Sequence, residues 1–564
     1  VHGSIAYDSY YYSRKKYSKT FPYYLARRDA EDPDYIYLIP QSEESIWSVS
    51  TGWDKNRKVY MEFGIDYNRT FGLHKTTALI LYNQSKYYSP SLQYYVPNAY
   101  QGLVGRLTYE YASRYLAEFN MGYNGTENFA KGKRFGFFPA VSLGWVISEE
   151  KFFPKNNIVK YLKVRGSYGE VGNDQIGGDR FLYLPSSYGA ASDSGVNKYN
   201  FGLASNPYTS LMIVENKIGN PDLTWEKAKK MNVGVDINLF NNCLTASFDI
   251  FKEKRNNILA NRSTSPMIIG ANLPAYNFGE MENRGWEMDL NFRHHIQDFH
   301  YWARFNYSFA RNEIIYMDEV QKRYDYQMTT GRRKNQFFGL IFDGYYNSWE
   351  EINALDRPKS SWSGNQLQPG DVKYVDVNQD GVIDDYDMVP IGYTPVPEII
   401  YGFSFGAQYK GFDFSILFQG ADNVSIKYFG RSMWPFAKGE ESAKSLIKER
   451  WTQERYEAGE KITFPRLSLN PNGETDHNYR PSTLWIRDAS YLRLKNLEVG
   501  YTFTGGFVKR LNLNSVRLYF NGSNLFTWTD VVDLDPEAPS RSGNVEINTY
   551  PLQKVYNIGL NINF

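Results

Sequence analysis

The segment between Asp376 and Asp387 places oxygen-bearing side chains at the spacing that a calcium ion requires. Calcium takes about six to eight carboxylate, amide and carbonyl oxygens, and a loop of roughly twelve residues can supply them around a central glycine. Gly381 occupies that glycine position, and Asp387 stands where the longer glutamate is usual. The predicted ligands are Asp376, Asn378, Asp380, the carbonyl group of Val382, Asp384 and Asp387.

The same segment has a second interpretation that requires no metal. Asp and Asn side chains accept hydrogen bonds from backbone N–H groups a few residues further on, so an Asx-rich turn can be rigid by itself. No helical pattern flanks residues 376–387, which lie in a long connection between predicted strands. Under both interpretations the segment has a structural role, and Ca²⁺ is the one cofactor that the sequence suggests.

Aromatic side chains in long connections form a second candidate site. Flat rings stack on sugar faces and also pack against peptide side chains, so they suit either ligand. The alternatives are packing within the loops and a girdle at the membrane interface. The candidate substrate-binding residues are Tyr345, Tyr346, Trp349, Trp362 and Trp434, within a wider loop set that adds Tyr88, Tyr94, Tyr95 and Tyr100.

Signatures of catalysis are weak. The histidines near one predicted turn, His294, His295 and His300, lack the carboxylate-backed spacing of a metal site and are interpreted as polar caps. The letters of a serine elbow occur at 402–406, but inside a predicted strand rather than between a strand and a helix. We therefore expect no enzyme.

Composition excludes further classes. The 564 residues carry 63 basic and 62 acidic side chains, a net charge of +1, which excludes a chain-wide basic field for nucleic acid. The single cysteine, Cys243, excludes a disulfide framework. Tyr, Phe and Trp make up 17% of the chain, more than one oily core needs. No run of about 18 apolar residues predicts a membrane-spanning helix, and no signal-like leader opens the chain.

The elements that must position these residues are strands. Apolar and polar residues alternate in many segments, for example in 59–68, 233–239, 286–293 and 556–564. Successive strand side chains point to opposite faces, so each segment has one apolar and one polar face. The sixteen predicted strands are 3–16, 46–69, 74–85, 102–111, 114–123, 135–147, 160–168, 228–239, 243–253, 284–294, 299–311, 399–409, 412–421, 492–503, 514–523 and 555–564.

The connections indicate a membrane barrel. Tight turns, as at Gly72-Leu73 and Lys410-Gly411, mostly alternate with long connections such as 312–398 and 422–491. Short turns on one rim and long loops on the other are typical of outer-membrane β-barrels. A propeller would repeat about every 40–45 residues, and no such period occurs. The polar face is rich in Asn, Gly, Ser, Asp and Tyr rather than Lys and Glu, which suits a hydrated lumen. The fold class is therefore all-β, a transmembrane antiparallel barrel in contact with outer-membrane lipid.

Seven segments, in order, resemble the C-terminal barrel half of SusC/RagA-type TonB-dependent outer-membrane transporters. The longest is GDVKYVDVNQDGVIDDYDMVPIGYTPVPEIIYGFSFGAQYKGFDFSILFQG, from Gly370 to Gly420. The others are RFGFFPAVSLGWVISEEKFF (134–153), LKVRGSYGEVGN (162–173), NPDLTWE (220–226), NRGWEMDL (283–290), YLRLKNLEVGYTF (491–503) and GSNLFT (522–527). Each motif is weak alone, but seven in sequence are specific.

The resemblance implies import of an oligosaccharide or oligopeptide across the outer membrane of a Gram-negative cell. It also implies energy from a TonB complex, a SusD-like surface lipoprotein as a lid, and pairs of transporter–lid units. Members of the family carry a plug domain inside a barrel of about 22 strands. We therefore expect residues 1–564 to be the C-terminal part of the barrel, with the plug and first strands on a missing N-terminal part. The terminal aromatic Phe564 resembles an assembly signal and suggests a native C-terminus.

Two other functions stay open at this point. Sixteen strands can close into a passive porin-like pore with an aqueous channel. A loop-driven adhesin is a third class, in which deletion of loop 422–491 abolishes attachment but not uptake. The residues do not separate a glycan substrate from a peptide.

Overall fold

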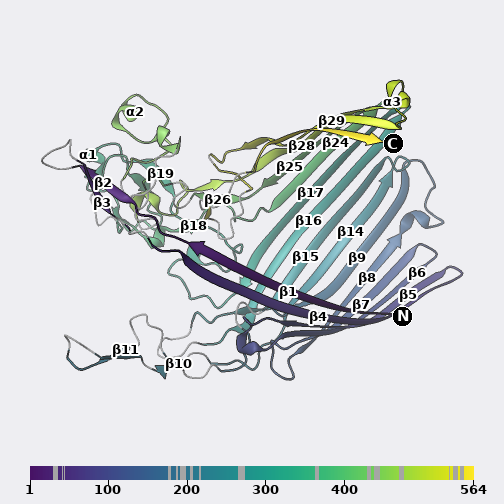
Figure 1. Ribbon diagram of the computed structural model, residues 1–564, viewed down its shortest axis with the longest axis horizontal. Coiled ribbons are helices and arrows are strands. Elements are labelled where there is room, and N and C mark those ends of the chain that lie inside the picture. The colour runs from purple at the N-terminus through teal and green to yellow at the C-terminus, as the bar shows by residue number, and fades with distance from the viewer. Residues whose placement is uncertain are drawn as a thin grey trace.

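The protein is built around one large antiparallel sheet (Figure 1). The computed structural model describes the chain from Val1 to Phe564 apart from residues 29–35, 41, 43–44, 176–179, 186–188, 191–197, 204–207, 212, 215–217, 265–272, 363–366, 429–433, 437–444, 469–475, 533, 538–543 and 546–551. Parts of the predicted long loops 169–227 and 422–491 therefore lie outside the described residues.

The sheet contains sixteen strands, and all sixteen match the predicted segments. They are β1 (His2–Ser18), β4 (Ser48–Phe71), β5 (His74–Tyr88), β6 (Asn98–Tyr111), β7 (Tyr115–Thr126), β8 (Phe135–Val146), β9 (Val159–Asn173), β14 (Glu226–Leu239), β15 (Leu244–Ala260), β16 (Tyr276–Ile296), β17 (Phe299–Tyr316), β24 (Ile399–Tyr409), β25 (Phe412–Asp422), β28 (Tyr491–Phe503), β29 (Ser515–Thr529) and β31 (Val555–Asn563). Several run further toward the long loops than predicted. There the residues are polar on both faces, as at Asn277 and Glu280, so alternation no longer marks them.

Each strand pairs with its neighbours along the sheet. The order in the sheet is β1-β4-β5-β6-β7-β8-β9-β14-β15-β16-β17-β24-β25-β28-β29-β31, and every pairing between them is antiparallel. Strands β1 and β31 stand at the two edges, so these sixteen strands do not close on themselves. The porin-like alternative required that closure and is not favoured.

The long connections contain short strands and helices. The strands there are β2 (Tyr24–Arg28), β3 (Ile36–Pro40), β10 (Gly189–Ala190), β11 (Lys198–Phe201), β12 (Tyr208–Leu211), β13 (Ile213–Val214), β18 (Phe338–Gly339), β19 (Phe342–Tyr345), β20 (Lys359–Ser360), β21 (Val372–Tyr374), β22 (Val382–Ile383), β23 (Val389–Pro390), β26 (Ser425–Tyr428), β27 (Ile486–Asp488) and β30 (Asn544–Val545). The short α-helices are α1 (Trp349–Ile352), α2 (Gln453–Glu457) and α3 (Phe507–Arg510). Among the described residues, no helix is both long and apolar enough to cross a bilayer.

Turns and loops alternate between the two rims of the sheet. The rim with tight turns carries connections such as Gly72-Leu73 and Lys410-Gly411, and both chain ends lie on that side (Figure 1). Gly411 has φ +94°, and a Cβ atom there would lie 2.8 Å from the carbonyl oxygen of Thr502, so only glycine fits this turn. The long connections gather at the opposite rim, as predicted.

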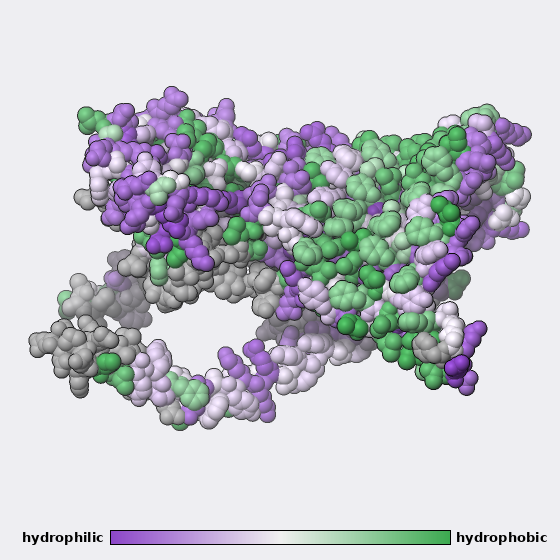
Figure 2. Space-filling model, turned by 90° about the horizontal axis from the view of Figure 1, so that it is seen from above, coloured by the Kyte–Doolittle hydropathy of each residue, from purple (hydrophilic) through white to green (hydrophobic). Residues whose placement is uncertain are grey.

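The two faces of the sheet differ in chemistry. Directly paired residues such as Phe63 and Tyr82, or Phe403 and Phe418, share the outer face, and large apolar side chains there are exposed. Figure 2 shows apolar side chains gathered over the wall of the sheet and hydrophilic ones over the loop end. Alternation along each strand therefore produces an apolar outer belt and a polar inner face, as a membrane barrel requires.

The long loops at 317–398 and 423–490 fold into a compact core of their own. Among the described residues, this loop core contains fifteen buried apolar residues from the two loops and Val531 from the connection after β29; Leu340, Val372, Phe464 and Trp485 are examples. Aromatic edges meet faces within it; the rings of Phe464 and Trp485 lie 5.5 Å apart at 82°. Hydrophobic burial thus makes these connections a structured cap beside the sheet rather than a set of independent loops.

Candidate functional site

The inner face of the sheet is lined with paired charges. Arg165 on β9 donates to Asp249 on β15 at 2.6 Å and to Asp236 on β14 at 3.1 Å. Arg517 on β29 lies 2.6 Å from Glu498 on β28 and also pairs with Asp413 on β25. Both arginines bridge three strands, and their partial burial strengthens the charge-assisted hydrogen bonds. The inner wall is therefore polar and already charge-compensated.

A cavity of about 620 Å³ opens on the inner face at the loop end. Inner-facing pairs supply one wall, since Lys58 pairs with Tyr87 across β4 and β5, and Tyr100 pairs with Thr126 across β6 and β7. The connections after β5, β7 and β9 supply most of the rest. Polar and aromatic residues dominate the lining, which includes Lys58, Tyr87, Asn98, Tyr100, Asn128, Asp174, Gln175 and Arg180.

Arg180 fixes the shape of this cavity. Its guanidinium lies 2.6 Å from the carboxylate of Glu127 and donates to the carbonyl oxygen of Pro97 at 3.1 Å. The Glu127 carboxylate also accepts from the N–H of Ala99 at 2.9 Å. One ion pair thus ties the loops after β5, β7 and β9 together. Aromatic rings thus lie beside amide, carboxylate and ammonium groups, an arrangement that suits a hydrated polar ligand. Among the described lining residues, no nucleophile is hydrogen-bonded to a base.

Sequence reasoning found only part of this cavity. Tyr100 belonged to the wider set of loop aromatics, but the charged residues Lys58, Asp174 and Arg180 were missed. They belong to segments far apart in the chain, and charged residues are common in every loop. The one available signal was that Lys58 falls on the polar face of an alternating strand.

The five predicted substrate-binding aromatics lie in different surroundings. Tyr345, Tyr346 and Trp434 are buried, with 8%, 7% and 4% of their surface exposed, and pack within the loops. Trp362 packs against the loop core, and the Arg480 guanidinium lies 4.1 Å from the centre of its ring. Trp349, at the start of α1, is 51% exposed. Packing within the loops, the alternative kept open above, describes the first three, and Trp349 presents the largest free ring surface of the five.

A buried polar network holds the loop core together. Asp371, only 3% exposed, pairs with Arg466 at 2.6 Å and accepts from the Asn478 side chain at 2.7 Å. The ring of His477 lies 2.8 Å from the Val372 carbonyl oxygen through Nε2 and 3.0 Å from Ser360 Oγ through Nδ1. Burial lowers the pKa of His477, although its bond to Val372 opposes this. Neutral His477 therefore links Val372 and Ser360 through hydrogen bonds and does not act as a charged group.

The predicted calcium loop folds as a network of its own hydrogen bonds. Asp376 accepts from the N–H groups of Gln379 and Gly381 at 2.7 and 2.8 Å. Buried Asp387 accepts from Val377 and Asp384, both at 2.8 Å. Asn378, Asp380 and Asp384 each accept from a backbone N–H two residues further on. Within the described part of the chain, no three His, Cys, Asp or Glu side chains form a group that could hold a metal ion. Calcium binding stays a prediction.

We expect loop 376–387 to keep its shape in excess chelator. Its carboxylates already bind backbone N–H groups, which are the same partners that make an Asx turn rigid without metal. Hydrogen exchange at the amides of Val377, Gly381 and Asp384, measured with calcium and with chelator, checks this expectation. Equal protection is the expected result. Protection that is lost in chelator and restored by calcium would establish the ion as part of the structure.

Comparison with known proteins identifies the family of the sheet. Residues 3–525 match the family model described as "TonB dependent receptor-like, beta-barrel". The TonB-dependent receptor P3 of Formosa agariphila is 28% identical over 479 residues, which are 82% of this chain and 45% of that protein. The TonB-dependent receptor SusC of Bacteroides thetaiotaomicron is 28% identical over 477 residues, 84% of this chain and 44% of that protein. The chain thus spans less than half the length of these two curated relatives.

Solved structures agree on the fold. A structure of the RagAB peptide transporter has a TM-score of 0.66 at 22% identity, with 91% of this chain and 56% of that chain covered. The RagAB peptide importer in its open-open state has a TM-score of 0.67 at 20% identity, with 100% and 62% covered. At these identities the likeness establishes the arrangement of strands. Together with the family match over most of its length, it shows that the chain belongs to the TonB-dependent receptor-like β-barrel family, a family of outer-membrane proteins.

Proposed function

We propose that this chain forms the C-terminal part of the barrel of an active outer-membrane importer for an oligosaccharide or oligopeptide. The observation that carries the proposal is the combination of an apolar outer belt with a charge-lined inner face on one continuous sheet of the TonB-dependent receptor family. A transport pathway needs a hydrated lumen, and an inner wall of compensated charges provides one without a large field of either sign.

The two sheet edges support the proposal that further strands complete the barrel. Backbone groups of β1 and β31 on their free edges cannot be satisfied by lipid, so a stable barrel requires partner strands there. A plug domain and about six strands outside residues 1–564 would supply the closed form that the family reaches at about 22 strands. The share of the relatives' length that the chain spans agrees with this division.

The cavity beside Tyr100 and Arg180 is the proposed contact for substrate on this part of the barrel. It lies on the inner face at the rim of long loops, where a ligand enters before it meets a plug. A SusD-like surface lipoprotein is the proposed partner at that rim, with paired transporter–lid units as the proposed assembly. Aromatic and charged groups together suit peptides as well as glycans, so both substrate classes are kept. Transport rather than catalysis is the proposed activity.

Removal of the energising partner tests this function. In cells that lack TonB, we expect uptake of the nutrient to stop while binding of the same nutrient to the cell surface is retained. Binding needs only the extracellular end of the transporter, whereas passage into the cell requires energy from TonB to displace the plug. Uptake and binding of a labelled substrate are measured in parallel. Uptake that continues at the normal rate without TonB contradicts an active importer, and steady conductance of the purified protein in a planar bilayer indicates a passive pore.

A further inference from the structure

Three cationic side chains gather on the outer face of the sheet at the loop end. They are Lys55 and Arg57 on β4 and Lys86 on β5, which together with Tyr88 we name the basic outer patch. The Arg57 guanidinium lies 4.5 Å from the centre of the Tyr88 ring, and the Lys86 ammonium lies 5.6 Å from the same point. Arg57 pairs directly with Tyr88, and Val59 with Lys86, so all of these residues share one face.

In the described part of the chain, the cations of the patch have no anionic partner. Many other lysines and arginines of the sheet form ion pairs, as Lys230 does with Glu253 and Lys252 with Glu282. Within the described residues, no carboxylate lies in ion-pair range of Lys55, Arg57 or Lys86, and all three are exposed. The nearby Glu127 is occupied by Arg180. Three uncompensated positive charges on an outward-facing wall create a local anion-binding potential.

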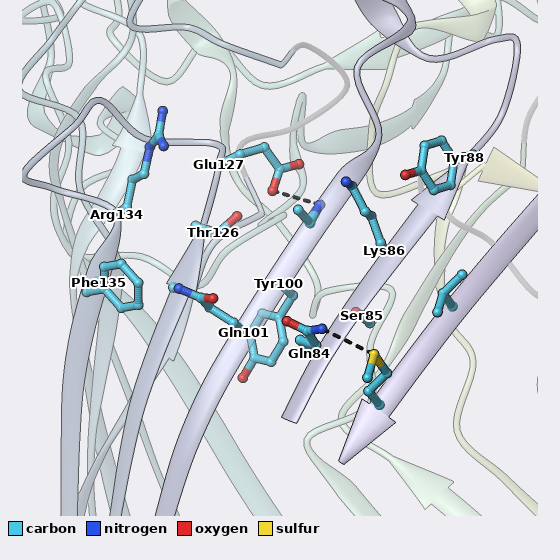
Figure 3. A pocket seen from close by; sticks show the side chains of 14 residues that line it. Gln84, Ser85, Lys86, Tyr88, Tyr100, Gln101, Thr126, Glu127, Arg134 and Phe135 are labelled. Atoms are coloured by element: carbon cyan, nitrogen blue, oxygen red, sulfur yellow. Dashed lines mark hydrogen bonds between the residues drawn. The ribbon is translucent and has the colours of Figure 1, made fainter. Parts of the chain in front are cut away.

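Hollows flank Tyr88 on this outer surface. One has a volume of about 590 Å³ and runs from Lys86 and Tyr88 past Gln84 and Gln101 to Phe135 (Figure 3). The other has a volume of about 380 Å³ and is lined by Tyr7, Lys55 and Arg57 together with Tyr88. Tyr88 thus separates two depressions that both begin among the cations.

The larger hollow changes from polar to apolar along the strands. Near its middle the Gln84 side-chain amide donates to Met61 Sδ at 3.3 Å, and Tyr82 Oη lies 3.2 Å from Gln84 Oε1. Val59, Met61 and Phe135 form apolar parts of its wall. Further from the loop rim lies the outer belt, where Phe63, Ile80 and Leu103 are exposed. A ligand that fits has an anionic head at the rim and a hydrocarbon tail along the belt.

We propose that the basic outer patch binds the phosphate group of an anionic lipid in the outer leaflet, with an acyl chain beside Val59 and Met61. Cationic side chains at a membrane surface attract anionic lipid heads. A free phosphate ion would satisfy the charges but would leave the apolar part of the hollow without a partner. The cations of the patch and the inner cavity proposed for substrate lie on opposite faces of β4 and β5, since Arg57 and Lys86 point outward and Lys58 and Tyr87 point inward. The two hollows meet only at the strand ends, where both are lined by Ser85, Ala99, Tyr100, Thr126 and Glu127.

Lipid binding by the full-length protein in detergent tests the proposal. The probes are diphosphorylated lipid A, the same lipid with its phosphates removed, and inorganic phosphate, each measured by native mass spectrometry. We expect the phosphorylated lipid to bind at least about tenfold more tightly than the dephosphorylated one. In the double variant Arg57→Gln/Lys86→Gln we expect its affinity to fall by about tenfold or more. Inorganic phosphate should not compete at the same concentration.

Lys58→Gln is the matched control, because this lysine is exposed on the same strand but points to the inner face. It should leave lipid binding unchanged. The shift of the folded barrel on an unheated gel verifies that each variant folds. Equal binding of both lipids, unchanged binding by the double variant, or full competition by inorganic phosphate would overturn the proposal. It would also be overturned if the double variant dissociated an oligomer while lipid failed to bind, since this face would then be an interface between copies.

Discussion

Replacement of Arg493 with methionine is expected to release the segment around residues 535–537 from the inner wall. The local free energy of unfolding of this segment should fall by about 3–5 kcal/mol, because a buried ion pair is broken. Arg493 is 2% exposed and lies 2.6 Å from Asp535 and 3.0 Å from Glu537 through its two terminal nitrogens. Methionine fills much of the volume but leaves Asp535 without its cation, while Glu537 keeps Lys495 at 3.1 Å and the Tyr491 hydroxyl at 2.6 Å. Hydrogen exchange at the amides of Glu537 and Leu552, both donors to Asp535, measures the loss.

Arg510→Met is the control for this variant, because Arg510 is exposed on the short helix α3. It should leave exchange at Glu537 unchanged. Slow exchange at Glu537 in the Arg493 variant would show that the carboxylates are held by other groups, and the proposed anchor would be wrong.

The Arg493 anchor also predicts how this segment responds to pH. Burial raises the pKa of Asp535, but hydrogen bonds from Arg493 and from the N–H groups of Glu537 and Leu552 outweigh it, so the net pKa lies below the ordinary value. A carboxylate with a lowered folded pKa stabilises the fold above its unfolded pKa of about 3.9. That contribution is lost as the pH falls through the folded value, and protection of the Leu552 amide should fall in the same range.

Replacement of Asp387 with asparagine is expected to unfold loop 376–387, with a local loss of about 3 kcal/mol or more. Asp387 is fully buried, and its two oxygens accept from Val377 and Asp384 at 2.8 Å and from Asn378 at 3.4 Å. An asparagine of the same shape must turn its NH₂ group toward one set of these donors. The backbone N–H groups on that side would then face the NH₂ donor instead of an acceptor. Protease cleavage within the loop, followed by mass spectrometry, detects the change.

Asp385→Asn provides the matched control for the loop. It removes the same charge from the same loop, but Asp385 is exposed. The protease should cut the control variant at the same rate as the unchanged protein. Equal resistance of both variants would contradict a role for the Asp387 carboxylate, and rescue of the Asp387 variant by calcium would point to an ion in its place.

The sheet could be predicted almost completely from sequence because the pattern that forms each strand lies in residues next to one another in the chain. Alternation along each strand encodes the two faces, and a one-residue error of register would turn Phe63 or Trp286 into the lumen, so the pattern is unambiguous. Tight turns could be predicted equally well from residue pairs such as Lys410-Gly411. Strand ends beyond the belt, as at Asn277, lose the alternation, and there the predicted limits were short.

The loops could not be predicted to the same degree because their contacts are distant in sequence. Burial of Tyr345 and Trp434 depends on partners contributed by other loops, and a lone aromatic residue looks the same whether it faces a ligand or a core. The cavity at Arg180 has the same origin. The basic outer patch was missed for another reason: Arg57 and Tyr88 face each other across the β4–β5 hairpin, whose tight turn was predicted, but Lys86 and Tyr88 lie beyond the predicted strand end at residue 85.

The neighbour-only order of the sheet has a consequence for how such a protein can change over evolutionary time. Every strand of the wall pairs with the next one along the chain, so a loop that lengthens at the rim adds chain without altering any register. The entropy of closing a flexible loop rises slowly, by about 0.6 kcal/mol for each doubling of its length. Segments such as 317–398 can therefore gain or exchange whole folded inserts at small thermodynamic cost. Recognition can diversify at the rim while the strand order of the wall that crosses the membrane is kept.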